Sequence, residues 1–174
     1  MKVLMLLFVL ILSCSAVAEV RDAESWFFHQ SFGDLSEEVE TAKEENKRGV
    51  MLFFEMDDCP FCARMKARIL NQSQVQDFFR ENFQIVAIDT QGDVEMTDFQ
   101  GQEISQKDFA YKTHGVRATP TMMFFDVEGQ LMARYTGATG TVEEFMWLGE
   151  FVVEGHYKTK RFSAYKREKR KLRD

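Results

Sequence analysis

Residues 50–62, with the sequence VMLFFEMDDCPFC, decide the fold of this chain. The first five of them are apolar, which is typical of a strand covered on both faces of a sheet. The last four are Cys59, Pro60, Phe61 and Cys62, and Pro60 suits the first turn of a helix. A loop closed by so near a pair removes little chain entropy, so the spacing favours redox chemistry over a structural crosslink.

The place of Cys59 at a helix start predicts that it is the nucleophile. Free backbone N–H groups and the helix dipole favour an anion there, which lowers the pKa of a cysteine. The thiolate is the form that attacks a disulfide. Cys62 lies one turn further along the same face, and we expect it to be less exposed and to resolve the mixed disulfide. The sequence therefore predicts a redox-active Cys59-Cys62 disulfide.

Helices and strands alternate along the rest of the chain. The order of the predicted elements indicates an α/β fold, with a central mixed sheet of four to five strands flanked by helices on both faces. The expected elements are a helix over 35–47 capped by Asp34, a strand over 50–56, a helix over 60–70, a helix capped by Ser73 and running through Phe79, a strand over 83–89, a hairpin or ordered loop over 94–104, a helix over 105–113 capped by Ser105, strands over 121–127 and 131–135, and a last helix capped by Thr139 or Thr141.

Length and composition allow one domain with a real core. The chain has 174 residues, of which 45% are apolar and 17 are phenylalanine, and this excludes a disordered protein. Only the first residues form a long apolar run, so we expect that the mature chain does not cross a membrane.

Residues 1–18 are expected to be a cleaved signal peptide. Lys2 supplies a positive start, residues 3–12 are apolar, and residues 16–18 form a small-x-small cleavage pattern. We expect export to the periplasm and a mature chain that begins at Glu19. Lipid anchoring at Cys14 is an alternative that the residues before it fit poorly. Cleavage leaves a single cysteine pair, which is too little for a disulfide scaffold.

Charge is distributed unevenly along the chain. Residues 19–157 contain 12 basic and 26 acidic side chains, whereas the tail over 158–174 contains nine basic and two acidic ones. The acidic body should repel nucleic acid and anionic lipid. The basic tail is either a solvated, frayed helix or a contact for a membrane surface or an acidic partner.

Three motifs together carry a resemblance to a known family. They are the cysteine motif at 59–62, the sequence Thr-Pro-Thr at 119–121 and the turn over 126–129 before the last predicted strand. With them the chain resembles the thioredoxin superfamily from about residue 35 to residue 153, and we expect a thioredoxin-like domain over 19–157. The Phe-Phe-Glu strand is similar to that of exported bacterial thioredoxin-like proteins, such as the thioredoxin of the sulfur-oxidation system.

The resemblance implies a substrate groove beside the cysteines. It implies that the bond between Thr119 and Pro120 is cis and that the Thr119 backbone can pair with an extended substrate. The alternative is a trans proline that opens an edge strand. Phe61 either offers an apolar face to substrates or packs on the helix surface.

Two departures from thioredoxin concern the charge near the cysteines. Asp57 and Asp58 stand directly before Cys59, and their carboxylates disfavour a thiolate. Thioredoxin also carries a buried acid where this chain has Phe53. Glu55 is the nearest acid and is either a proton relay to Cys62 or a solvated carboxylate at the strand end.

The sequence thus predicts an exported thiol-disulfide oxidoreductase that reduces protein disulfides. The resemblance implies that a membrane electron-donor protein recharges it. The alternatives are a disulfide oxidase or isomerase, or a non-catalytic binding module. We expect no cofactor and no metal, because zinc needs about four ligands and His29, His114 and His156 lack ligand spacing. Substrates would be protein disulfides or dithiols, and no nucleic acid partner is expected.

Overall fold

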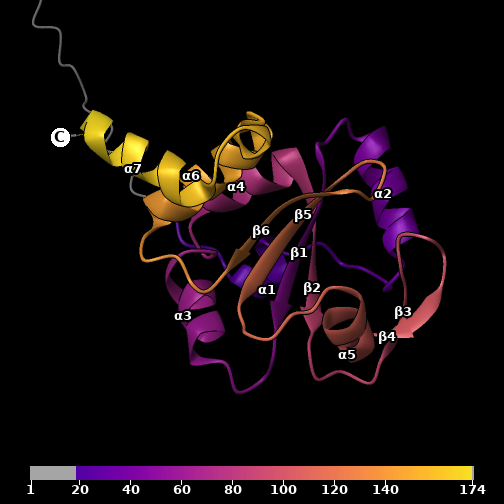
Figure 1. Cartoon of the computed structure of the whole chain (residues 1–174). Helices are drawn as coiled ribbons and strands as arrows, with labels where there is room; N and C mark the ends of the chain where they lie inside the picture. Colours follow the sequence, from indigo (N-terminus) through magenta and orange to yellow (C-terminus); the bar gives the residue numbers. More distant parts are fainter. Residues whose placement is uncertain (1–18, 174) are drawn as a thin grey trace, which may run out of the picture.

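The computed structural model describes residues 19–173, so the expected signal peptide and Cys14 lie outside the described residues. Figure 1 shows a twisted central sheet with helices packed on either side of it. The strands follow the order β2-β1-β5-β6 across the sheet. Their bounds are Gly49–Glu55 for β1, Phe83–Asp89 for β2, Thr121–Asp126 for β5 and Leu131–Thr136 for β6.

Strand pairing brings the chemically important segments to one end of the sheet. β1 runs parallel to β2, and Glu55 lies opposite Asp89 at the carboxyl end of both strands. β1 runs antiparallel to β5, so Phe54 near the end of one strand pairs with Thr121 at the start of the other. The segment that follows β1 and the segment that precedes β5 therefore leave the sheet at the same end.

Alternation along β1 divides the core into two layers. Met51 and Phe53 point into one apolar cluster, whereas Val50, Leu52 and Phe54 point into another. The first cluster is covered by helices α3 (Pro60–Arg68), α4 (Ser73–Asn82) and α6 (Val142–Val153), and the second by α2 (Leu35–Glu44) and by α5 (Gln106–Asp108) with the π-helix that continues it, η1 (Phe109–Thr113). The predicted mixed sheet with helices on both faces is confirmed.

The segment over 94–104 is a hairpin rather than a loop. Strands β3 (Glu95–Thr97) and β4 (Glu103–Ser105) pair antiparallel and form a separate two-stranded sheet. Gly101 lies at the turn with a φ of 77°. The Ser105 hydroxyl accepts a hydrogen bond from the Asp108 backbone N–H, which confirms its predicted capping role.

Several predicted helix ends were wrong. α2 stops at Glu44 rather than at residue 47, because Asn46 adopts a left-handed conformation with a φ of 56°. Ser73 does not cap α4, since Gln72 is the residue before the helix and no side chain caps it. Of the two candidate caps for α6, Thr141 accepts the hydrogen bond from the Glu144 backbone N–H.

Helices α4 and α6 approach each other so closely that one position requires glycine. A Cβ atom added at Gly149 would lie 2.5 Å from the ring of Phe78 and 2.8 Å from the ring of Phe79. Phe79 also stacks on Phe145 of α6, with ring centroids 4.4 Å apart. This aromatic contact fixes α6 against the first core layer.

The N-terminal segment is ordered and contains a short helix, α1 (Ala23–Trp26), that the sequence did not predict. The backbone N–H of Arg21 donates to the carbonyl of Asn71, and that of Ser73 donates to the carbonyl of Glu19. Phe27 is fully buried in the same core layer as the cysteines. The N-terminal segment is therefore packed into the domain as part of the fold.

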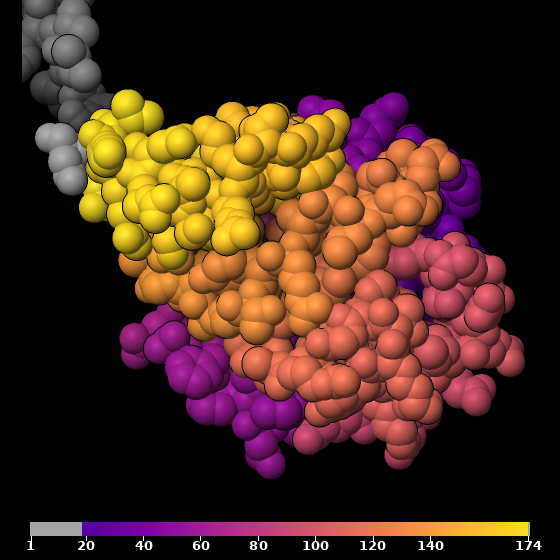
Figure 2. Space-filling view, in the orientation of Figure 1, coloured from indigo at the N-terminus to yellow at the C-terminus, as the bar shows by residue number. Residues whose placement is uncertain are grey.

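The basic tail folds back on the domain. A short 3-10 turn, η2 (His156–Lys158), leads into α7 (Phe162–Arg173), which packs along α6 with Tyr165 buried. Figure 2 shows the C-terminal residues lying directly against the rest of the surface. Among residues 19–173, no helix combines the length and the apolar character that a membrane span requires.

Candidate active site

The site begins where β1 passes into α3. After Glu55 the chain turns through residues 56–58, and Cys59 becomes the residue before the first turn of α3, with Pro60 in that turn. The Cys59 sulfur accepts a hydrogen bond from the Cys62 backbone N–H at 3.1 Å. An otherwise unpaired N–H at the helix start thus points at the sulfur, as the sequence predicted.

Cys59 and Cys62 form a disulfide, and their Cα atoms lie 5.2 Å apart. Cys59 is 4% exposed and Cys62 is 2% exposed, so both residues are buried and Cys59 is only slightly the more accessible of the two. Both line a cavity of about 200 Å³ at the end of the sheet. Access to the sulfurs from this side therefore leads through the cavity.

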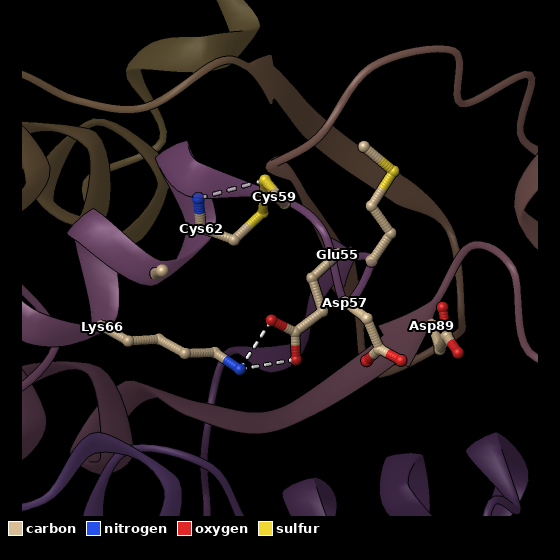
Figure 3. A pocket seen from close by; sticks show the side chains of 8 residues that line it. Glu55, Asp57, Cys59, Cys62, Lys66 and Asp89 are labelled. Carbon is tan, nitrogen blue, oxygen red and sulfur yellow. Dashed lines mark hydrogen bonds and ion pairs between the residues drawn. A yellow bond between two sulfur atoms is a disulfide. The ribbon is translucent and has the colours of Figure 1, made fainter.

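Acidic side chains and one cation share this cavity with the disulfide. Figure 3 shows Glu55 and Lys66 pointing toward each other beside the cysteines, with Asp57 and Asp89 also in view. Glu55 and Asp89 face each other because their strands are paired in register. Three carboxylates thus line the cavity with one ammonium group, which makes the surroundings of the sulfurs predominantly acidic.

Lys66 contacts two carboxylates, and one of them, Glu55, lines the cavity. Its Nζ atom donates to Glu55 Oε1 at 2.8 Å and lies 2.6 Å from Glu55 Oε2. The same Nζ atom lies 2.5 Å from Glu24 Oε1 and 5.4 Å from the ring centre of Phe28. Burial alone would lower the pKa of Lys66, but the hydrogen bonds to Glu24 and Glu55 raise it above its ordinary value.

Glu55 holds its proton more firmly than an ordinary glutamate. Burial raises the pKa of its carboxyl group, and the hydrogen bond and charge of Lys66 offset only part of that effect. Glu24 and Asp89 raise it further through their negative charges. This environment differs from that of a solvated strand-end carboxylate, because Glu55 is largely buried beside the disulfide.

Thr119 and Pro120 lie at the same end of the sheet. Their peptide bond is cis, and Pro120 is buried. Thr119 lines a second, smaller cavity of about 50 Å³ together with Met56, Tyr111 and other residues. Met56 also lines the cavity beside the cysteines, so one side chain separates the two hollows.

Phe61 is exposed between the two cysteines. The residue is 53% exposed, and the guanidinium carbon of Arg64 lies 5.2 Å from the centre of the Phe61 ring. The ring therefore does not pack into the core. It presents an apolar face beside the cysteines, with an arginine over it.

The family follows from a match to a family model described as a thioredoxin-like domain, which covers residues 35–152. The chain belongs to the thioredoxin-like family. The matched range contains the cysteine pair, Glu55, Lys66 and the Thr119-Pro120 bond. It does not include Glu24, α1 or α7.

Solved structures confirm the thioredoxin-like fold. A thioredoxin-fold protein from Helicobacter pylori is 22% identical with a TM-score of 0.60, over 71% of this chain and 84% of that one. A putative disulphide-isomerase from Bacteroides thetaiotaomicron is 24% identical with a TM-score of 0.56, over 80% and 98%. The DsbH oxidoreductase is 21% identical with a TM-score of 0.55, over 75% and 88%. No curated protein is significantly similar to this chain in sequence.

The sequence motifs missed Lys66 and Glu24. Lys66 carried a usable signal, because it follows Cys62 by four residues and therefore lies on the same face of the helix. Glu24 carried none, since it lies in an unpredicted helix of four residues and 31 positions before Glu55. Over residues 19–173, no group of three or more His, Cys, Asp or Glu side chains is placed to hold a metal ion.

Proposed function

We propose that this thioredoxin-like protein is a thiol-disulfide oxidoreductase that reduces protein disulfides. The observation that carries the proposal is the Cys59-Cys62 disulfide at the start of α3, where a helix N–H points at the Cys59 sulfur and a cavity reaches both residues. This arrangement stabilises a thiolate on Cys59 once the disulfide is reduced.

The reaction proceeds in two exchange steps. In the dithiol form, the Cys59 thiolate attacks one sulfur of the substrate disulfide; a new S–S bond forms, and the second substrate sulfur leaves as a thiolate. Cys62 then loses its proton and attacks the Cys59 sulfur, which forms the Cys59-Cys62 disulfide and expels the first substrate sulfur. The substrate gains two electrons, and a separate dithiol reductant must return them to the protein.

Glu55 is the proposed acceptor of the Cys62 proton. It lines the cavity that Cys62 lines, and its raised pKa makes it a better base than a solvated glutamate. Lys66 holds the carboxylate in place through two short contacts. The ion pair therefore orients the base and limits how strongly it binds a proton.

The charge of the cavity supports a reducing direction. Glu55, Asp57 and Asp89 line it, and Asp58 is exposed directly before Cys59. Negative charges near the sulfurs oppose a thiolate and so destabilise the reduced form. Strong oxidants of this chemistry owe their potential to the opposite effect, a stabilised reduced form. We therefore propose a reductant.

Thr119, Pro120 and Phe61 form the proposed substrate groove. The Thr119-Pro120 segment and the cysteines lie at the same end of the sheet, and Phe61 is exposed between the cysteines. An extended substrate segment would pair with the Thr119 backbone and lay an apolar side chain on Phe61.

Two variants test the mechanism. Cys59→Ser should abolish reduction of insulin disulfides, because no attacking thiolate remains. Cys62→Ser should instead accumulate mixed disulfides with substrate, because nothing resolves them, and electrophoresis without reductant would show them. Equal and full turnover by both variants would refute the proposal. No turnover by the wild-type protein with any dithiol would favour a non-catalytic binding module.

The reducing direction has its own test. Disulfide oxidase or isomerase activity is the runner-up, and the names of two structural neighbours, DsbH oxidoreductase and a putative disulphide-isomerase, keep it open. Titration of the cysteine pair against a glutathione or dithiothreitol buffer distinguishes the two. A potential near about −270 mV would support the reductant, and one near about −120 mV an oxidant.

Export and partners belong to the same proposal. We propose cleavage after Ala18, a periplasmic thioredoxin-like domain over 19–157, and recharging by a membrane electron-donor protein. N-terminal sequencing of protein recovered from cell fractions tests the cleavage. Proteins captured by the Cys62→Ser variant would identify the pathway, and the sulfur-oxidation system is the first candidate because of the Phe-Phe-Glu strand.

A further inference from the structure

We infer that Glu24 is a positioning residue of the redox site: it shares the Lys66 ammonium with Glu55 and thereby sets how readily Glu55 takes a proton. The inference deepens the proposed function, because it rests on Glu55 acting as the base for Cys62. Glu24 lies in α1, outside the range that matches the family domain. The contact therefore joins a residue outside the matched range to two residues inside it.

A single ammonium group serves two carboxylates at this point. Lys66 Nζ lies 2.5 Å from Glu24 Oε1 and 2.6 Å from Glu55 Oε2. The Glu55 and Lys66 side chains are 18% and 21% exposed, whereas that of Glu24 is 61% exposed. Glu55 lines the cavity beside the cysteines, whereas Glu24 lines a neighbouring hollow that Lys66 also lines, and the two carboxylates compete for the same cation.

The backbone around Glu24 is held in place. Asp22 caps α1 by accepting a hydrogen bond from the Ser25 backbone N–H at 2.8 Å. The Arg21 backbone N–H donates to the Asn71 carbonyl at 2.8 Å, and Phe27, the residue that follows the helix, is fully buried. α1 also packs against α3, which carries Lys66. The backbone that carries Glu24 is therefore fixed relative to α3 and Lys66.

Charged groups reach Glu55 from four parts of the fold. Lys66 comes from α3, Glu24 from α1, Asp89 from the end of β2, and Asp57 from the turn after β1. Only Lys66 among them is a cation. Removal of Glu24 leaves Lys66 to Glu55 alone and also takes away one negative charge. Both effects favour the ionised form of Glu55, so they act in the same direction.

The consequence lies in the second exchange step. The proton leaves the Cys62 thiol for a Glu55 carboxylate oxygen, and the Cys62 sulfur attacks Cys59 as the bond from Cys59 to the substrate breaks. A weaker base at Glu55 accepts that proton less readily, but it is ionised down to a lower pH. Glu24 therefore shifts the pH range in which the step is fast.

Carbon NMR titration of the Glu55 carboxyl group in the oxidised protein tests the inference without any turnover. The Glu55→Gln variant assigns the signal. Glu24→Gln should move the titration midpoint down by a few tenths of a pH unit, since Glu24 is partly screened by solvent, whereas Lys66→Gln should move it up by roughly one unit or more. Glu24→Asp should restore part of the wild-type midpoint.

Glu19→Gln is the matched control, because Glu19 belongs to the same segment but pairs with Arg21. It should leave the Glu55 midpoint unchanged. A Glu24→Gln midpoint equal to that of the wild type, in a variant with an unchanged melting temperature, would overturn the inference. If Glu24→Gln is less stable than the wild type, the Glu55 midpoint of Glu24→Asp is compared with that of the wild type instead. A residue that only anchors the fold would leave this midpoint unchanged.

The pH profile of turnover separates this inference from the proposed function. The rate of single-turnover reduction of a mixed disulfide is measured as a function of pH. On the acidic side of this profile (the acidic limb), Glu24→Gln should shift the fall in rate to lower pH by the amount that NMR measures. An inactive wild-type protein would remove the proposed function and leave the NMR result standing. An active protein whose acidic limb is the same in both forms would remove the inference and leave the function standing.

Discussion

Asp57 carries one of the negative charges on which the proposed direction of the reaction rests. It lines the cavity that holds the disulfide and lies two residues before Cys59. We predict that Asp57→Asn raises the reduction potential, because loss of the negative charge stabilises the thiolate of the reduced form. The rise should reach up to about 30 mV, which is a tenfold change in the exchange equilibrium for two electrons.

Glu40→Gln provides the comparison for this measurement. Glu40 is an exposed carboxylate on α2, which covers the opposite face of the sheet from α3. Redox titration should give the wild-type potential for this variant. A potential that falls in Asp57→Asn, or that shifts equally in both variants, would contradict a local effect of Asp57.

Residues whose position is set by neighbours in the sequence could be placed from the sequence alone. The placement of Cys59 and Cys62 follows from a strand, a proline and a spacing of three, all within 13 residues. The partners of Lys66 could not be predicted, since Glu24 and Glu55 approach it from two other elements and only tertiary packing brings the three together. Burial, which raises the pKa of Glu55, is also a property of the folded chain alone.

At the scale of elements, the N-terminal segment completes the edge of the sheet. β2 is an edge strand, and its outer side is partly covered by His29. The His29 backbone N–H donates to the Ile85 carbonyl, and the Ile85 backbone N–H donates to His29 Nδ1, each at 2.9 Å. One residue therefore satisfies both free backbone groups of Ile85, which protects the edge from pairing with another chain.

This contact predicts a loss of stability in mild acid. Burial, together with the charges of Arg80 and Lys47, lowers the pKa of His29 from 6.5 to about 4. The unfolded chain then binds the proton more readily than the folded one, so the contribution is complete above about pH 6.5 and is lost as the pH falls toward 4. The loss should be on the order of 1–2 kcal/mol after allowance for solvent screening.

Urea unfolding at pH 7 and pH 5 measures this effect. His29→Gln keeps an acceptor for the Ile85 N–H but cannot titrate, so its stability should depend less on pH over this interval than that of the wild type. The comparison removes the contribution of His114, whose pKa is also lowered by burial. Equal pH dependence in the two proteins would exclude His29 as the source.

Element type was easier to predict than element ends. Strands such as β1 and β5 have short uninterrupted apolar runs, which are typical of strands buried on both faces of a sheet. The end of α2 depends on Asn46 entering a left-handed conformation, which asparagine tolerates but does not have to adopt. Helix α1 has four residues, too few for a periodic signal, and its position depends on Phe27 reaching the core.

At the scale of the whole molecule, four of the nine basic residues of the tail pair with acidic residues of the body. Acidic residues of α6 pair with basic residues of α7 at distances of 2.6–3.8 Å. The pairs are Lys166 and Arg170 with Glu144, Lys169 with Glu150, and Arg173 with Glu143. Much of the basic tail is thus used internally, which reduces the charge left for a membrane surface or an acidic partner.

Apolar contact should hold α7 more strongly than these ion pairs do. Tyr165 is buried against Phe151, with ring centroids 5.5 Å apart. We predict that Tyr165→Ala costs roughly 2–4 kcal/mol of unfolding free energy, as for other large aromatic truncations near a core. Lys169→Gln, on the same helix, should cost less than about 1 kcal/mol, because a partly exposed ion pair contributes little.

Chemical denaturation of both variants at low and high salt checks this order. The Lys169 effect should shrink further in high salt, while the Tyr165 effect should persist, since salt screens charge but not burial. A larger loss from Lys169→Gln than from Tyr165→Ala would show that the ion pairs hold the helix. The sequence could predict the charge asymmetry between body and tail, but not that Tyr165 would bring the two together.

Both cysteines belong to the same apolar cluster as Phe27, Phe28 and Phe53. Electron transfer and conformational stability are therefore linked in one thermodynamic cycle. Suppose that the native protein favours the disulfide over the dithiol more strongly than the denatured chain does. The disulfide form is then more stable to unfolding than the dithiol form by the same free energy. About 30 mV of that preference corresponds to about 1.4 kcal/mol. Reduction of the Cys59-Cys62 disulfide by two electrons would thus also change how firmly the interior is held together.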